Sequence, residues 1–351
     1  MRLGKTIWIK ISAGILVFGL ASCGPQQSPA PTEPSAPIPT TVPEPTPTPE
    51  WEPELLFSLE HEDAVESVAF SPDGAMLASG LFLEVHLWDV SDGTPIKMIE
   101  HRHSVEDLDI SPNGETLGAG QSTYGVQISG LQGSEEPRQL HGGFNSRIAF
   151  SPDGSTLATG NREGTVWIWN LESDEPLAEF IAPDAGWITA LAYSPDGEIL
   201  AAGHFDCLVH IWQVSDGQLL HTFERDGYAC PSSGLAFSPD GDFLVGAGSQ
   251  IDSEYGAKVW AVADGSLQEA LPSSSETKDV AFSPDGGLLA IGANDALTLW
   301  QMPDFSLLYT LDQAFNEDAH DWVTRIDFSP DGTLLAVGRN NGVMEVWKVQ
   351  P

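Results

Sequence analysis

The sequence has few basic residues, few cysteines and no long hydrophobic run. Its 351 residues include 14 Lys and Arg against 51 Asp and Glu, which gives a formal net charge of −37. A surface of this sign repels nucleic acid and anionic lipid headgroups, so we expect neither as a partner. The apolar run from Ile11 to Leu20 is about half as long as a helix that spans a bilayer.

The sequence also lacks the motifs that mark common catalytic and metal sites. It contains no nucleophile elbow, no phosphate-binding glycine loop and no His-Glu-x-x-His helix. Two acidic groups, residues 316–321 and the pair Asp252 and Glu254, do not have the spacing of a calcium loop or a zinc site. We therefore expect no catalytic residue, no metal and no cofactor.

What the sequence does have is an internal repeat. The stretch VAFSPDGAMLASG at residues 68–80 returns as IAFSPDGSTLATG at residues 148–160. Ser-Pro-Asp-Gly occurs seven times at intervals of 40 to 46 residues, with Asn113 replacing Asp in the second copy. Pro fixes φ at the first central position of a tight turn, Asp tolerates the second, and Gly takes the positive φ that follows. Each copy therefore predicts two strands joined by a turn.

The period of the repeat predicts the fold class. About four short strands in 40 to 46 residues are typical of a β-propeller blade, and the 3.6-residue spacing of helical repeats is absent. We expect an all-β protein, a seven-bladed β-propeller of four-stranded antiparallel blades over residues 54–351. The run ELLFSLE at residues 54–60 precedes the first repeat, and the last repeat ends after its third strand. The two should pair and close the ring, which removes exposed sheet edges.

Tryptophans recur at one position of the repeat, 14 to 19 residues after the turn Gly. They are Trp88, Trp169, Trp212, Trp260, Trp300 and Trp347, and Ser129 holds the place in the second repeat. Here the chain resembles the WD-repeat β-propeller family, in a bacterial form. The resemblance is atypical, because only Trp88 is followed by Asp.

The resemblance implies a structural hydrogen-bonded set of His, Ser and Asp with the Trp. The first repeat has His61, Ser79 and Trp88 at these places, while Asp206 matches the Asp of another repeat. No repeat has all four residues, so we expect apolar packing to hold the blades together. The resemblance also implies a platform for protein assembly.

Two segments precede the repeats. Residues 1–22 carry basic residues and then the short apolar run, as in a signal peptide. They end in Leu20-Ala21-Ser22-Cys23, which resembles a bacterial lipobox, so we expect Cys23 to be lipidated; the alternative is an ordinary cleaved signal with an incidental Cys. Residues 24–53 hold 11 Pro in 30 residues and predict, with Cys23, a Pro/Thr-rich disordered linker. The propeller would then be exported and anchored outside the cytoplasmic membrane, or to the outer membrane of a two-membrane cell.

The two remaining cysteines, Cys207 and Cys230, lie in adjacent repeats at the same expected end of the propeller. In an exported protein this placement predicts a disulfide. The alternative is two unpaired thiols.

One end of the propeller is expected to carry the irregular loops, among them residues 249–257, 224–232 and 312–321. This end is rich in aromatic residues, which are favoured anchors at binding surfaces. The candidate partner-binding residues are Phe82, Tyr124, Phe144, Trp187, Phe205, Tyr228, Tyr255, Phe315 and Trp322. Three of them, Phe144, Trp187 and Trp322, share one register, and we expect them at the mouth of the central channel; the alternative is that they only fill it.

Together these features predict a non-catalytic scaffold that is a monomeric propeller, binds a protein or peptide through its aromatic loops and attaches to the membrane through Cys23. One alternative is a propeller enzyme or a module that binds a sugar or small molecule of the cell envelope at the channel mouth. Another is a purely structural spacer.

Overall fold

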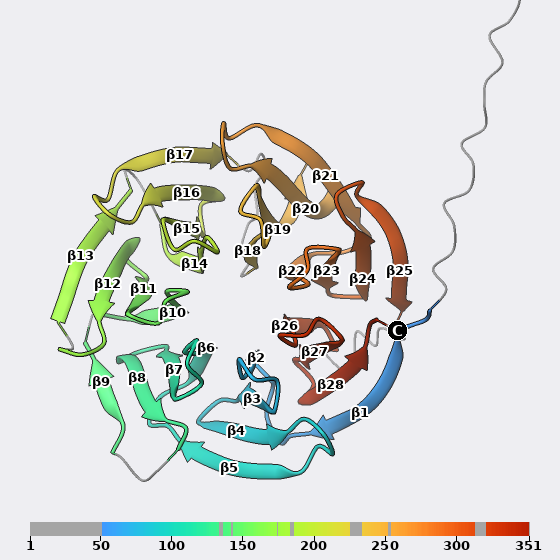
Figure 1. The fold of residues 1–351 in the computed structure, drawn as a ribbon, viewed down its shortest axis with the longest axis horizontal. Coiled ribbons are helices and arrows are strands. Elements are labelled where there is room, and N and C mark those ends of the chain that lie inside the picture. Colours follow the sequence, from blue (N-terminus) through green and yellow to red (C-terminus); the bar gives the residue numbers. More distant parts are fainter. Residues whose placement is uncertain are drawn as a thin grey trace, which may run out of the picture. The chain divides into compact units, whose positions relative to one another are not determined.

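The computed structural model describes residues 51–132, 136–141, 143–173, 175–182, 186–224, 234–251, 254–312 and 321–350. These residues form seven four-stranded antiparallel sheets, and no helix occurs among them. Figure 1 shows the sheets as blades arranged in a ring about a common axis. The predicted seven-bladed β-propeller is confirmed.

Each blade runs from an inner strand beside the channel to an outer strand at the rim (Figure 1). Blade 1 contains β2 (Ser67–Phe70), β3 (Met76–Gly80), β4 (Glu84–Asp89) and β5 (Pro95–Glu100). Blade 2 contains β6 (Val105–Ile110), β7 (Thr116–Gln121), β8 (Gly125–Gly130) and β9 (Arg138–Leu140). Blade 3 contains β10 (Asn145–Phe150), β11 (Thr156–Asn161), β12 (Thr165–Asn170) and β13 (Glu175–Ile181). Blade 4 contains β14 (Ile188–Tyr193), β15 (Ile199–His204), β16 (Leu208–Gln213) and β17 (Leu219–Glu224).

The remaining blades follow the same order. Blade 5 contains β18 (Leu235–Phe237), β19 (Phe243–Ile251), β20 (Glu254–Ala261) and β21 (Leu267–Ser273). Blade 6 contains β22 (Thr277–Phe282), β23 (Leu288–Ala293), β24 (Ala296–Gln301) and β25 (Ser306–Asp312). Blade 7 contains β26 (Val323–Phe328), β27 (Leu334–Arg339), β28 (Val343–Lys348) and, as its outer strand, β1 (Glu54–Glu60).

The Ser-Pro-Asp-Gly segments form the turns between the first and second strands of the blades. In blade 1 the N–H of Gly74 donates to the Ser71 carbonyl at 2.8 Å, and Gly74 has a φ of 70°. The Ser71 hydroxyl donates to the Asp73 carboxylate at 2.6 Å, and Asp73 accepts the N–H of Ala75 at 3.0 Å. Ser and Asp therefore fix the turn through a local hydrogen-bond network, while Gly supplies the positive φ.

The ring is closed as the sequence predicts. β1 pairs antiparallel with β28, with Glu54 opposite Lys348 and Glu60 opposite Val343. Phe57 and Leu59 are half-buried and pack against a cluster of buried residues from blades 1 and 7. The first strand of the propeller thus completes its last blade.

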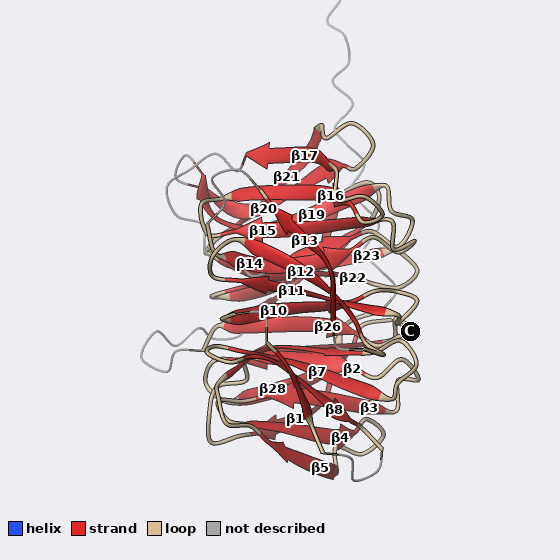
Figure 2. Ribbon diagram, turned by 90° about the vertical axis from the view of Figure 1, so that its left-hand side faces the viewer, coloured by secondary structure: helices blue, strands red, loops and turns tan. Residues whose placement is uncertain are grey.

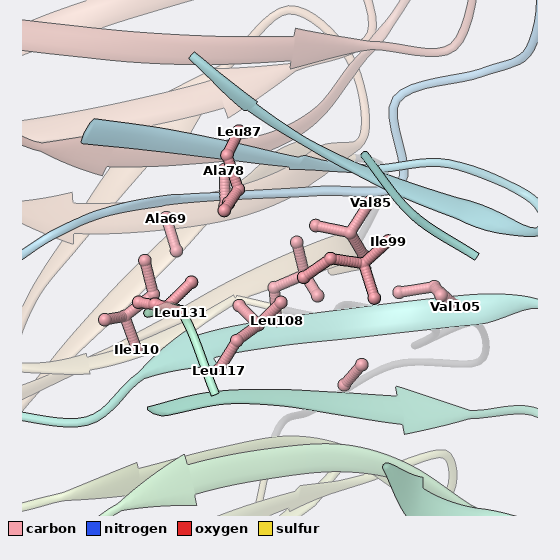
Figure 3. Packing of buried hydrophobic residues seen from close by; sticks show 11 residues of the cluster. Ala69, Ala78, Val85, Leu87, Ile99, Val105, Leu108, Ile110, Leu117 and Leu131 are labelled. Atoms are coloured by element: carbon pink, nitrogen blue, oxygen red, sulfur yellow. The ribbon is translucent and has the colours of Figure 1, made fainter. Parts of the chain in front are cut away.

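Neighbouring blades are joined by apolar packing between their sheets. Figure 3 shows one such cluster, which includes Val85 and Leu87 of blade 1 together with Leu108 and Leu117 of blade 2. Leu87, Val85 and Leu117 are at most 1% exposed. Similar clusters lie between the other blades, so the core is a ring of inter-blade layers rather than a single centre.

The strands run between two different faces, and Figure 2 shows them in side view. We call the end with the Ser-Pro-Asp-Gly turns the turn face, and the end with the second-to-third-strand connections and the blade-to-blade loops the loop face. β1 begins at the turn face, because its first residue pairs with the last residue of β28. The described propeller therefore begins and ends at the turn face.

The irregular loop expected at residues 249–257 was predicted wrongly. β19 continues to Ile251 and β20 begins at Glu254, and these two residues pair, so the described residues of this segment belong to strands.

Candidate binding site on the loop face

Exposed aromatic side chains gather on the loop face over blades 1 to 4. Phe82, Tyr124, Phe144, Trp187 and Phe205 lie in loops at this face and are each about half exposed, between 48% and 55%. Aromatic side chains with this much exposed surface are costly to leave in water and are typical binding anchors. Of the other candidates, Trp322 and Tyr255 are half-buried, while Tyr228 and Phe315 lie outside the described residues.

Trp187 and Phe205 form the centre of a fixed cluster between blades 3 and 4. Their ring centroids are 5.5 Å apart, and the N–H of Phe205 donates to the Trp187 carbonyl at 2.8 Å. The guanidinium of Arg162 lies 5.2 Å from the centre of the Trp187 ring, and it forms an ion pair of 3.1 Å with Glu106. The contacts with Phe205 and Arg162 hold the exposed Trp187 ring in place, which lowers the entropy cost of using it as an anchor.

A second aromatic group lies on blade 2. The Tyr124 ring stacks on His103 at 4.9 Å between centroids and meets His141 edge-on at 5.4 Å. The hydroxyl of Thr123 is 2.7 Å from Nδ1 of His103, which orients the imidazole. Tyr124 is thus supported from two blade-to-blade loops.

The channel mouth holds a cavity of about 340 Å³ at the loop face. Its lining comes from the beginnings of the inner strands and the residues just before them. The charged and aromatic lining residues are Glu66, Glu106, Arg147, Lys278, Trp322 and Arg325. Trp322 was expected at the channel mouth and lines this cavity, whereas Phe144 and Trp187 do not line it.

The two arginines of the cavity are held by defined contacts. Arg325 forms ion pairs with Asp107 at 2.8 Å and with Asp279 at 3.4 Å. Arg147 donates from Nε to the Thr189 carbonyl at 2.7 Å and from Nη1 to the Glu106 carbonyl at 2.8 Å. The two guanidinium groups are therefore anchored across blades 2, 3, 4, 6 and 7.

A second cavity of about 390 Å³ lies further along the channel, where the inner strands end at the turn face. Two carboxylates that line it are those of Asp109 and Asp327, and burial raises the pKa of each to about 7. Asp109 accepts the backbone N–H of Phe150 at 2.7 Å, so it links blade 2 to blade 3.

The hydrogen-bonded set that the resemblance to WD-repeat propellers implies is present in blade 1 as three residues. The Trp88 indole N–H donates to the Ser79 hydroxyl oxygen at 2.9 Å, and Nε2 of His61 is 3.0 Å from the same oxygen. Ser79 is fully buried. Asp206, the family's Asp in blade 4, instead accepts the N–H of Gly186 at 3.2 Å at the loop face.

Other blades give the Trp indole a different acceptor. Trp169 donates to Thr159 at 2.9 Å and Trp300 to Thr298 at 3.0 Å. In blade 7, Trp347 donates to Glu345 at 3.1 Å. Trp212 and Trp260 are buried in inter-blade clusters.

Cys207 is a buried residue with a positive φ of 73° in the β15–β16 turn, and it is disulfide-bonded. Its expected partner Cys230 lies outside the described residues, as does Cys23, so the Cys207–Cys230 pairing and the lipidation stay predictions. In the part of the chain that the structure describes, no group of three His, Cys, Asp or Glu side chains is placed to hold a metal ion. No helix within the described ranges is long and apolar enough to cross a membrane.

Sequence reasoning missed the basic residues of the channel. Arg147 and Arg325 each stand three residues before the aromatic residue that ends an inner strand, and Asp107 and Asp279 occupy the same register. That shared register was the available signal for residues that face the channel.

Comparison with known proteins agrees with this fold. The family model described as WD domain, G-beta repeat (WD40) matches residues 53–89, 141–170, 174–213 and 306–348. The chain is also similar to the serine-threonine kinase receptor-associated protein of Dictyostelium discoideum, with 28% identity over 114 residues, or 32% of this chain and 39% of that protein. The chain therefore spans about two fifths of the length of the curated relative that it matches. Four segments of the chain thus match the WD40 repeat model, and its seven four-stranded blades have the architecture of a β-propeller.

Proposed function

We propose that this protein is a non-catalytic scaffold that binds a protein or peptide partner through the aromatic side chains of its loop face. The observation that carries the proposal is that five aromatic side chains in the loop-face loops of blades 1 to 4 are about half exposed. Each of these rings exposes apolar area that a partner would remove from water, at about 25 cal/mol per Å². WD40 propellers commonly bind proteins, which supports the same function.

We further propose that Cys23 attaches the protein to the outer side of a membrane. The described propeller begins at the turn face, where β1 starts beside the end of β28. The exposed aromatic side chains lie on the opposite, loop face, so the start of the propeller does not cover them.

Capture of partners from native envelope tests the binding function. The bait is the full chain, compared with a Trp187→Ala, Phe205→Ala variant. The matched control is a Leu177→Ala, Ile181→Ala variant, which removes two equally exposed apolar side chains from the outer strand β13. We expect the loop-face variant to lose specific partners that the control retains. Identical capture by all three proteins would show that the aromatic cluster is not the binding surface.

The anchor has its own test. Replacing Cys23 with Ser should move the exported chain from the membrane fraction to the soluble fraction. Persistent membrane association of the Cys23→Ser variant would require another anchor, and it would leave the loop-face proposal unaffected.

A second candidate function, a module for a small molecule of the cell envelope, is favoured by the cavity that Trp322 lines together with Glu66 and Glu106. A ligand of this kind should raise the melting temperature of the full chain and should lose that effect in a Trp322→Ala variant.

A further inference from the structure

We propose that the aromatic cluster over blades 3 and 4 receives an arginine side chain carried by the protein partner. The cluster consists of Phe144, Trp187 and Phe205 together with the neighbouring carboxylates of Glu163 and Asp206. The inference rests on the proposed binding function of the loop face and specifies the chemistry of the group that the partner presents there. An aromatic ring would contact the guanidinium and its aliphatic stem, and the carboxylates would pair with its charge.

On blade 3 an exposed ring has a carboxylate beside it. Phe144 is 48% exposed in the loop before β10. Glu163, in the β11–β12 turn, lies against Gly143, the residue before Phe144: a Cβ in place of the Gly143 hydrogen would be 3.7 Å from Oε2 of Glu163. Apolar surface and negative charge are therefore next to each other on this blade.

Blade 4 repeats the arrangement with two rings. Trp187 and Phe205 are 51% and 52% exposed, and their ring centroids are 5.5 Å apart. Asp206 directly follows Phe205 and accepts the backbone N–H of Gly186, the residue before Trp187, at 3.2 Å. This hydrogen bond holds the carboxylate of Asp206 at the loop that carries Trp187.

Neither carboxylate has a cationic partner within the described residues. The backbone N–H of Glu163 donates to Asn161 at 3.0 Å, but the Glu163 carboxylate itself has no hydrogen bond or ion pair there. Asp206 accepts one further backbone N–H, that of Leu208 at 3.3 Å. Burial lowers the pKa of His210, a neighbour of Asp206, to about 4, so this imidazole is neutral at pH 7. Two exposed negative charges thus remain for a partner to neutralise.

The cation next to this cluster is already paired. Arg162 forms an ion pair of 3.1 Å with Glu106, and its guanidinium lies 5.2 Å from the centre of the Trp187 ring. Arg162 therefore leaves the charges of Glu163 and Asp206 unmet. Its contacts also show that a guanidinium can lie over a ring of this cluster while it pairs with a carboxylate.

Arginine has the chemistry that this surface matches. Its planar guanidinium stacks on aromatic faces and donates paired hydrogen bonds to carboxylates, whereas the lysine ammonium is a compact and strongly hydrated point charge. The chain as a whole has 51 acidic against 14 basic residues, so its field attracts a basic segment before contact is made.

Short peptides test this chemistry on the full chain, with ligand-observed NMR as the readout. Acetyl-Gly-Arg-Gly-amide is the arginine probe. The same tripeptide with citrulline has the same shape without the charge, and the tripeptide with lysine has the charge without the planar group. We expect the arginine probe to bind about tenfold more tightly than the citrulline probe, to bind more tightly than the lysine probe, and to weaken with salt.

Variants locate the site of binding. Glu163→Gln should weaken the arginine probe by about threefold, and the Glu163→Gln, Asp206→Asn variant by about tenfold, because partly exposed ion pairs contribute modestly. Asn at position 206 keeps an oxygen that can accept the backbone N–H groups. The matched control is Glu172→Gln, which removes an exposed negative charge from the turn face of the same blade. Binding of the citrulline probe should be the same in all of these proteins.

Four results would overturn the inference. They are equal binding of the arginine and citrulline probes, a lysine probe that binds as tightly as the arginine probe, no binding of any probe, and a double variant that loses no more than the Glu172→Gln control.

The failure of this inference differs from the failure of the proposed function. If the Glu163→Gln, Asp206→Asn variant captures the partner as well as the unmodified chain does while the Trp187→Ala, Phe205→Ala variant loses it, the rings bind a partner without an arginine between the carboxylates. If the aromatic variant also retains the partner, the proposed function itself is wrong.

Discussion

The backbone N–H of Phe70 donates a hydrogen bond of 2.7 Å to the carboxylate of Asp327, and this bond joins the first blade to the last. Asp109 makes the same kind of bond between blades 2 and 3. Both carboxylates line the turn-side cavity of the channel. Buried carboxylates therefore help to hold the inner strands in a closed ring.

These two carboxylates should make stability depend on pH. Their pKa of about 7 lies above the ordinary value of 3.8 for an Asp side chain, so the folded protein holds the proton more tightly than the unfolded chain. The two carboxyl groups contribute most to the free energy of unfolding below about pH 3.8. This contribution is lost as the pH rises through about 7. An Asp109→Asn, Asp327→Asn variant cannot ionise there, so its stability relative to the unmodified protein should increase between pH 5 and pH 8. Denaturant unfolding at the two pH values measures this difference.

Asp73→Asn provides a control of opposite sign for that experiment. The Ser71 hydroxyl lowers the pKa of Asp73 in the turn. Ionised Asp73 therefore stabilises the fold when the pH is above the pKa that Asp73 has in the unfolded chain. Its Asn variant should lose stability at neutral pH relative to strongly acidic pH. A pH-independent effect of the channel variant would contradict a raised pKa at Asp109 and Asp327.

Removing the shared acceptor of blade 1 should destabilise the fold. Ser79→Ala leaves the Trp88 indole and the His61 ring without the hydroxyl oxygen that both contact. We expect the free energy of unfolding to fall by about 1 to 3 kcal/mol, the usual cost of an unsatisfied buried polar group. Thr159→Val, which deprives only Trp169 of its acceptor, should cost no more than Ser79→Ala in the same denaturant titration. A Ser79→Ala variant as stable as the unmodified protein would show that the hydrogen bonds of Ser79 with Trp88 and His61 contribute nothing to stability.

The closing strand gives a third prediction. Phe57→Ala removes a half-buried ring that packs against the cluster of blades 1 and 7, and it should lower the free energy of unfolding by about 2 kcal/mol. Leu56→Ala on the same strand is the control, because Leu56 is 44% exposed. Deletion of Glu54–Glu60 should lower the melting temperature much further, since β28 then becomes an open edge. Unchanged melting of the deletion variant would contradict closure by β1.

The cysteine pair can be tested by mass. If Cys207 and Cys230 are bonded, reduction of the exported protein adds the mass of two hydrogen atoms, and a Cys207→Ser variant loses about 3 kcal/mol of stability. Two free thiols in the unreduced protein would rule out the pairing.

The fold was predictable because its signal is local and repeated. Ser71, Asp73 and Gly74 fix a turn within a few residues, and seven copies of that turn set the number of blades. The loop at residues 249–257 was predicted wrongly because its polar, glycine-containing sequence is typical of a loop. Its backbone groups nevertheless continue the ladder of β19 and β20.

The binding site was predictable only in part. Loop position was sufficient to find the exposed rings, but the direction of Trp187 depends on Arg162 and Phe205 from two other loops. The basic lining of the cavity was missed because it depends on contacts such as Arg325 with Asp107, 218 residues apart in the chain. Contacts of this range follow from the circular arrangement of the inner strands and not from any local pattern.

The position of β1 beside β28 also guides the labelling of this protein. A fluorescent protein or an affinity tag fused to the C-terminal end would follow β28, which ends at the turn face where β1 begins. Such a fusion leaves the aromatic surface uncovered, so imaging and purification of the tagged chain would not interfere with partner binding.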